Sequence, residues 1–179
     1  MDSEHERIEA DTKDWTWVLN RPCPACGYDA AATPAQEVAG RLRAQVPLWQ
    51  SALAGPAPRV RRRPSPAVWS VLEYACHVRD VCRVFDGRVT RMLIEDGPSF
   101  ENWDQDATAE ADDYPAQDPT AVSTELADAA SVLADRFDAV PATAWDRPGH
   151  RSDGSTFTVE SLSRYFLHDL VHHLHDIRR

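Results

Sequence analysis

The sequence predicts an all-α protein, a four-helix bundle, from three observations. Its 179 residues suffice for one domain with a sizeable core and are too few for two comfortable ones. Hydrophobic residues make up 42% of the chain, which is enough for a packed interior. Four segments repeat apolar residues at helical spacing, and no strand-like alternation of comparable length occurs. We therefore expect four amphipathic helices joined by long connections or insertions.

The first two predicted helices have recognisable start and stop signals. A helix over 33–55 starts at Thr33, which is followed by a proline, and stops at a Gly-Pro pair. A longer helix over 65–96 starts at a Ser-Pro pair and also stops at Gly-Pro. Its expected buried stripe comprises Val71, Ala75, Val78, Cys82, Phe85, Val89 and Leu93.

The last two predicted helices follow polar connections. Asp118 and Pro119 start a helix that Pro141 ends. A turn-rich connection then leads to Thr158, whose hydroxyl can cap a helix over 158–177. The stretch "STFTVE" before that helix is expected to be extended for a few residues. The inward stripe of the last helix comprises Leu162, Phe166, Leu170, Leu174 and Ile177.

Charge and hydropathy exclude several classes of protein. The net charge of −10 repels nucleic-acid backbones, and the one basic run, "RVRRRP" from Arg59, lies beside prolines as a solvated linker would. No stretch reaches the roughly 18 apolar residues of a membrane span. The acidic N-terminus lacks the pattern of a secretory signal. We expect a cytoplasmic protein with no nucleic-acid or membrane partner.

The segment "YFLHDLVHHLHDI" holds four of the seven histidines. His168 and His172 are four residues apart on a helix, so their Cβ atoms lie about 5–6 Å apart and can share one ion. A third ligand is available from the second helix, where His77 borders the apolar stripe. We predict a metal site formed by His77, His168 and His172, with zinc as the first choice and nickel or iron also compatible. His173 is expected to point elsewhere, toward water.

The same histidine pair also matches the zinc-protease pattern H-E-x-x-H, with Asp169 in place of the glutamate. Aspartate is one methylene shorter and reaches a bound water less well. This mismatch disfavours a protease.

The second concentrated signal is "RPCPACGYD", a C-x-x-C motif at Cys23 and Cys26 within an N-terminal extension over 1–32. Three interpretations stay open: a metal-binding knuckle, a redox-labile pair or a plain turn. We do not assign the two cysteines to the histidine site, although they are the first candidates if it has a fourth ligand. The extension could cover the mouth of that site.

A histidine early in the second helix of a bundle, followed by H-x-x-x-H in the last, resembles the DinB-like superfamily. The resemblance covers residues 33–179 and matches its ligands at His77, His168 and His172. It implies relatives such as the mycothiol-dependent maleylpyruvate isomerases, the mycothiol S-transferases and the bacillithiol transferases of the YfiT kind. In the isomerases the middle ligand is typically a glutamate, where this chain has His168. Lys13 is the only lysine among many arginines, a bias typical of high-GC genomes that favours an actinobacterial source and the mycothiol branch.

The resemblance implies a metal-dependent enzyme that uses a low-molecular-weight thiol, here mycothiol, against a small electrophile as a transferase or isomerase. The metal would stabilise the thiolate near neutral pH. Two alternatives stay open: a metal-dependent hydrolase with water as nucleophile, and a non-catalytic metal-binding stress-response module. The acidic loop over 97–118 and the connection before Thr158 are expected to be chiefly solvated linkers. Alternatively they could line a substrate pocket in which Trp103 or Arg151 contacts the electrophile. Exposed bundle faces could support a homodimer.

Overall fold

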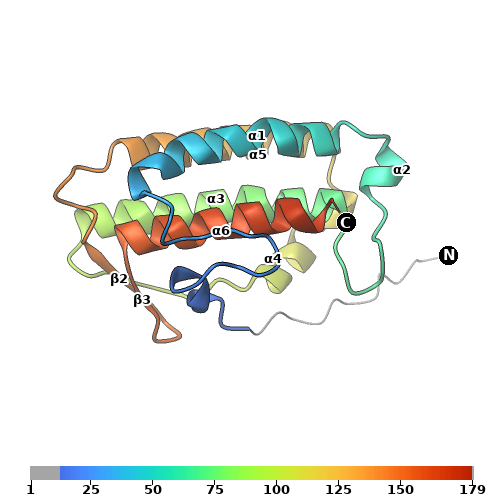
Figure 1. Cartoon of the computed structure of the whole chain (residues 1–179). Helices are drawn as coiled ribbons and strands as arrows, with labels where there is room; N and C mark the ends of the chain where they lie inside the picture. The colour runs from blue at the N-terminus through green and yellow to red at the C-terminus, as the bar shows by residue number, and fades with distance from the viewer. Residues whose placement is uncertain (1–12, 179) are drawn as a thin grey trace.

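The four long helices form the predicted bundle. The computed structural model describes residues 13–178, and its bundle consists of α1 (Val38–Leu53), α3 (Val71–Ile94), α5 (Pro119–Asp138) and α6 (Val159–Asp176). Figure 1 shows α1 and α5 along one side of the molecule and α3 and α6 along the other. Both α1 and α3 pack against α5, and α6 packs against α1 and α3. The all-α, four-helix prediction is confirmed. Within the described chain, no helix is both long and apolar enough to cross a bilayer.

A small sheet closes one end of the bundle. Its order is β1-β2-β3, with β1 parallel to β2 and β2 antiparallel to β3. Only the strand in "STFTVE" was expected, because strands of two to four residues are too short to show a period of two. The strands are β1 (Ser99–Phe100), β2 (Pro148–Arg151) and β3 (Thr156–Thr158), and the short helices are η1 (Thr16–Leu19), η2 (Ala35–Glu37), α2 (Ala57–Val60), α4 (Gln105–Ala111) and η3 (Tyr114–Ala116).

Helix α3 begins later than predicted because a better cap lies downstream. Ser70 accepts a hydrogen bond from the Glu73 N–H at 3.2 Å, and the Glu73 carboxylate accepts one from the Ser70 N–H at 2.8 Å. Ser65 has no acidic or amide residue three positions on, so it cannot form this reciprocal pair. Residues 65–68 form a turn instead, and the predicted start at Ser65 is wrong.

Of the other predicted helix starts, two are confirmed and one is wrong. Asp118 and Thr158 cap α5 and α6 as predicted, and each accepts the backbone N–H of the third residue after it. Thr33 does not cap α1, because its hydroxyl donates to the Asp29 carbonyl at 2.8 Å and the α-helix begins only at Val38.

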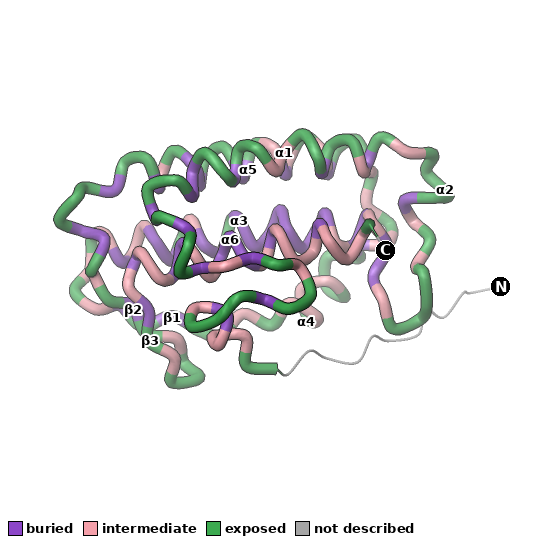
Figure 2. The backbone as a smooth tube through the Cα atoms, viewed as in Figure 1, coloured by how far each residue is buried: buried purple, intermediate pink, exposed green. Residues whose placement is uncertain are grey.

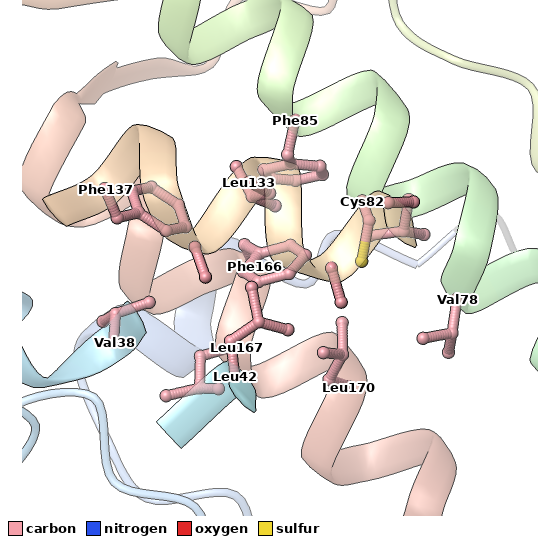
Figure 3. Packing of buried hydrophobic residues seen from close by; sticks show 14 of the residues in the cluster. Val38, Leu42, Val78, Cys82, Phe85, Leu133, Phe137, Phe166, Leu167 and Leu170 are labelled. Atoms are coloured by element: carbon pink, nitrogen blue, oxygen red, sulfur yellow. The ribbon is translucent and has the colours of Figure 1, made fainter. Parts of the chain in front are cut away.

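The core lies between the two pairs of helices, where the buried residues face one another (Figure 2). Phe166 of α6 is fully buried at its centre, and its ring lies 5.3 Å from that of Phe85 and 5.9 Å from that of Phe137 (Figure 3). Cys82 points into this core as a small apolar residue. Cys76 is fully buried as well, with its thiol 3.6 Å from Gln117 Oε1.

We expect Glu73→Ala to destabilise the protein by about 2–4 kcal/mol. Glu73 is 2% exposed, caps α3 and accepts a hydrogen bond from Arg63 Nε at 2.9 Å. Without the Glu73 carboxylate, the partly buried guanidinium of Arg63 loses its counter-ion and the Ser70 N–H loses its acceptor. Urea denaturation measures the loss. The matched control is Glu37→Ala, which removes an exposed pair with Arg41 and should cost about 0–1 kcal/mol.

The stability difference between wild type and Glu73→Ala should also depend on pH. Burial by itself raises the pKa of Glu73, but its hydrogen bonds with Arg63 and Ser70 outweigh burial and lower the pKa below its usual value. A carboxylate with a lowered folded-state pKa stabilises above the unfolded pKa of about 4.3 and loses this effect as the pH falls through the folded-state value. The stability difference between wild type and Glu73→Ala should therefore shrink in acid. A difference that grows below pH 4 would contradict this role.

Candidate metal centres

Helix α6 carries donors for two separate centres. Within each, the candidate ligand atoms lie within 4.8 Å of one another. The His77 centre comprises His77, Asp169 and His173, and the Cys23 centre comprises Cys23, Cys26, His168 and His172. Consecutive residues of an α-helix point about 100° apart, so the 168/172 pair and the 169/173 pair face different neighbours.

This grouping differs from the predicted one. His168 and His172 do lie together, as their spacing predicts, but their neighbours are the two cysteines and not His77. His77 faces the next pair along the helix. His173, expected in water, is only 17% exposed and belongs to the His77 centre. Metal binding by any of these residues stays a prediction.

The donors of the His77 centre converge at distances suited to a shared ion. His77 Nε2 lies 3.3 Å from Asp169 Oδ2, and His173 Nε2 lies 3.4 Å from Asp169 Oδ1. Ligands about 2.0–2.2 Å from one ion are separated by about 3.0–3.5 Å. Both ring nitrogens of His77 and Oδ2 of Asp169 are buried and form no hydrogen bond within the described chain. Buried polar atoms without partners are rare, and a cation would satisfy those that face Asp169.

The charges of the His77 centre depend on one another. Burial lowers the pKa of His77. Burial works against the charged form of Asp169 as well, yet His173 and His77 outweigh it and lower the pKa of that carboxyl. In the same way, Asp169 and then Asp176 outweigh burial and raise the pKa of His173 to about 9. Without a metal ion, the carboxylate is therefore held by a protonated His173.

Aromatic side chains enclose the His77 centre. Trp103 stacks on the His77 ring at 5.5 Å and 12°, and Trp69 contacts the same ring at 5.3 Å. Tyr74 lies 5.0 Å from the His173 ring. Such walls limit the access of water to the His77 ring, whereas the Asp169 side chain is 30% exposed.

An open groove of about 570 Å³ adjoins this centre through Trp103, which lines it. The groove also contains Arg88, Glu101, Asn102 and Asp104, and none of the three donors of the His77 centre lines it. Arg151, expected to contact a substrate, lies elsewhere: its guanidinium is over the rings of Phe157 and Tyr165 and pairs with Asp153. His150 is exposed.

The Cys23 centre joins the N-terminal extension to α6. Cys23 Sγ lies 3.6 Å from His172 Nδ1. Burial raises the pKa of the Cys26 thiol to about 11 and lowers the pKa of His168 to about 4, so both are neutral when no ion is present. All four cysteines of the chain are free thiols.

Asp169 and His173 could have been found from the sequence. They have the same i, i+4 spacing as the 168/172 pair. The rotation of α6 about its axis decides which pair faces His77. Because apolar residues flank both pairs, the sequence pattern does not fix that rotation.

The fold and these donors define a four-helix bundle with a candidate metal centre between facing helices. The chain belongs to the DinB superfamily, whose model matches residues 56–177. Among solved structures it is similar to YfiT from Bacillus subtilis, described as a probable metal-dependent hydrolase with an unusual four-helix bundle topology. The two share 17% identity with a TM-score of 0.72, over 81% of this chain and 86% of that one. No match is found among the curated proteins.

Proposed function

We propose that this protein is a metal-dependent enzyme whose catalytic ion is held by His77, Asp169 and His173. The observation that carries the proposal is the convergence of two imidazoles and a carboxylate. Within the described chain, both ring nitrogens of His77 and Oδ2 of Asp169 are buried without a hydrogen-bond partner. Two histidines and a carboxylate form a known catalytic zinc set, and iron or nickel also suits such donors. Three protein ligands leave a coordination position open. A divalent ion there would lower the pKa of a thiol or of water and so supply a nucleophile at neutral pH.

The residues around the His77 centre have roles that follow from their contacts. Asp176 Oδ2 lies 3.3 Å from His173 Nδ1, so it accepts that N–H and leaves Nε2 as the ligand. Trp69 and Trp103 keep water from the buried side of His77. The Asp169 side chain is 30% exposed, so we expect a small molecule to reach the centre past this residue.

The first choice of nucleophile is a low-molecular-weight thiol, mycothiol, acting on a small electrophile in a transferase or isomerase reaction. Asp169 supplies the carboxylate expected for the middle ligand of the mycothiol-dependent relatives. The neighbouring groove presents carboxylates, an amide, an arginine and an indole, a lining that suits a hydroxyl-rich thiol carried on a sugar. These features support the thiol without requiring any residue of the Cys23 centre.

The second candidate is a hydrolase that uses water at the same centre. The description of the Bacillus subtilis structure as a probable metal-dependent hydrolase favours it. The two candidates share their metal ligands and differ only in the nucleophile.

The experiment combines purified zinc-loaded protein with mycothiol and a panel of electrophiles, and in parallel with ester and amide substrates without thiol. Thiol conjugates or isomerised products that disappear with chelator support the transferase or isomerase. Thiol-independent hydrolysis supports the hydrolase. Binding of zinc at the His77 centre without turnover in either arm would overturn the enzyme and leave a metal-binding module. His150→Ala, a histidine outside both centres, is the control and should behave as wild type.

Asp176→Asn should weaken zinc binding at the His77 centre by about 10–100-fold, because residues that orient a ligating histidine typically contribute that much. The change keeps the shape of the side chain and removes its charge. Competition with a chromogenic chelator measures the affinity. Asp138→Asn, which alters only an exposed ion pair with Arg43, serves as the control. Equal affinities in the two variants would contradict the role of Asp176.

A further inference from the structure

We propose that Cys23, Cys26, His168 and His172 bind a structural zinc ion that fastens the N-terminal segment, residues 13–32, to α6. This site is separate from the His77 centre and takes part in no step of the proposed reaction. It resolves the C-x-x-C motif in favour of a metal-binding knuckle whose second half lies 145 residues downstream, from Cys23 to His168.

The donors have the composition and spacing of a tetrahedral zinc site. Two thiolates and two imidazoles are a common structural set, with Zn–S about 2.3 Å and Zn–N about 2.0–2.1 Å. In a tetrahedron of those dimensions, a sulfur and a nitrogen lie about 3.6 Å apart. The distance from Cys23 Sγ to His172 Nδ1 is 3.6 Å, and all four candidate donor atoms fall within 4.8 Å of one another.

His168 supplies an independent observation. It is 4% exposed, and its Nε2 has no hydrogen-bond partner within the described chain. Its helix neighbours Leu167 and Leu170 are almost fully buried, so an apolar residue would fit this position at lower cost. An ion that accepts the imidazole lone pair explains a histidine here.

The C-x-x-C turn is already closed in the form that presents both sulfurs. The Gly27 N–H donates to the Cys23 carbonyl at 2.8 Å, and the Cys23 N–H donates to the Tyr28 carbonyl at 2.8 Å. Gly27 has a φ of +75°, a conformation that other residues adopt only with strain. The turn therefore holds two thiols together on the side that faces α6.

Aromatic rings cover the Cys23 centre. Trp15 lies 5.7 Å from the His168 ring and 5.2 Å from the His172 ring, and Tyr28 lies 5.8 Å from the His168 ring. Asp176 Oδ2 lies 3.7 Å from His172 Nε2, on the opposite side of that ring from the sulfur. Four protein ligands under such a cover leave no position for a substrate, which is the character of a structural site.

A zinc ion would join residues 13–32 strongly to α6. The direct polar links of this segment to α6 include the hydrogen bond that the Tyr28 hydroxyl donates to the Arg164 carbonyl at 3.0 Å. Just beyond the segment, Arg164 Nε donates to the Thr33 carbonyl at 2.8 Å. Binding releases a proton from each thiol to solvent, so its free energy depends on pH. Figure 1 shows the blue N-terminal part of the chain passing beside α6 before it enters α1.

The test replaces zinc with cobalt(II) in the full-length protein under reducing conditions. Cobalt at the Cys23 centre should give the thiolate-to-metal charge-transfer band and the intense visible absorption of a tetrahedral ion, whereas the His77 centre has no sulfur. The Cys23→Ser/Cys26→Ser variant should lose the charge-transfer band and bind one equivalent of metal fewer than wild type. Cys76→Ala removes a thiol outside the cluster and should retain the band.

Hydrogen exchange of residues 13–32 supplies a readout that does not depend on a variant. Removing metal from the wild-type protein should speed exchange in this segment at least tenfold, with a smaller effect in α5. Absence of the charge-transfer band in wild type, or its persistence in the double-serine variant, would overturn the proposal. A Cys23–Cys26 disulfide that forms in the presence of zinc would overturn it as well.

The outcome is independent of the enzymatic proposal. Asp169→Asn should retain the cobalt–sulfur band while losing the ion of the His77 centre. Loss of turnover with the band intact therefore tests the His77 centre alone. Loss of the band with metal still bound at the His77 centre tests only the Cys23 centre.

Discussion

Replacing Asp169 with asparagine should reduce zinc affinity at the His77 centre by more than about 100-fold and abolish turnover. Loss of a residue that only orients a metal ligand lowers metal affinity about 10–100-fold, so loss of a charged ligand itself should lower it further. Asparagine keeps the size of the side chain but removes the negative charge that lies within 3.4 Å of both histidines. Affinity is measured by chelator competition, and turnover with whichever nucleophile proves active.

His150→Gln is the matched control, since it removes a histidine from an exposed strand position. His77→Ala should reproduce the loss of metal seen in Asp169→Asn. Full metal content and rate in Asp169→Asn would remove Asp169 from the ligand set and with it the proposed catalytic centre.

Phe166→Ala should destabilise the protein by about 3–5 kcal/mol, the largest single effect on folding that we expect. The ring is fully buried and contacts aromatic rings from both α3 and α5 (Figure 3). Its removal loses transfer free energy and leaves a cavity that three helices cannot all close. Urea denaturation measures the change.

Val132→Ala is the control for this substitution, because Val132 is 53% exposed on α5 and should change stability by less than about 0.5 kcal/mol. Comparable losses in the two variants would mean that Phe166 does not lie at the centre of the core.

The sequence predicted the helices well because their apolar stripes and end signals are local. Asp118 and Thr158 cap helices as expected, since the hydrogen bond that each forms depends on residues within one turn. The start of α3 was misjudged because Ser65 and Ser70 are both plausible caps, and only the carboxylate of Glu73 distinguishes them. The acidic loop was expected to be a linker, but it contributes Trp103 to the enclosure of His77 through a non-local contact.

The candidate ligands were predicted less well than the fold. The pattern identified three residues that the structure places in candidate centres, but it could not give the rotation of α6 relative to α3. That rotation decides whether His77 faces His168 or Asp169, and it is set by packing of the whole core. The approach of Cys23 to His172 depends on how the extension folds back, which no local pattern encodes.

Both donor pairs of α6 depend on the residue spacing of the same helix. One residue inserted between Asp169 and His172 would turn everything beyond it by about 100° and advance it by about 1.5 Å. Both centres would then lose their distal histidine in one mutational event. The same insertion at the exposed hairpin tip near Gly154 lies outside the helix and leaves both registers intact. Tolerance to length changes should therefore fall abruptly where the chain enters the last helix.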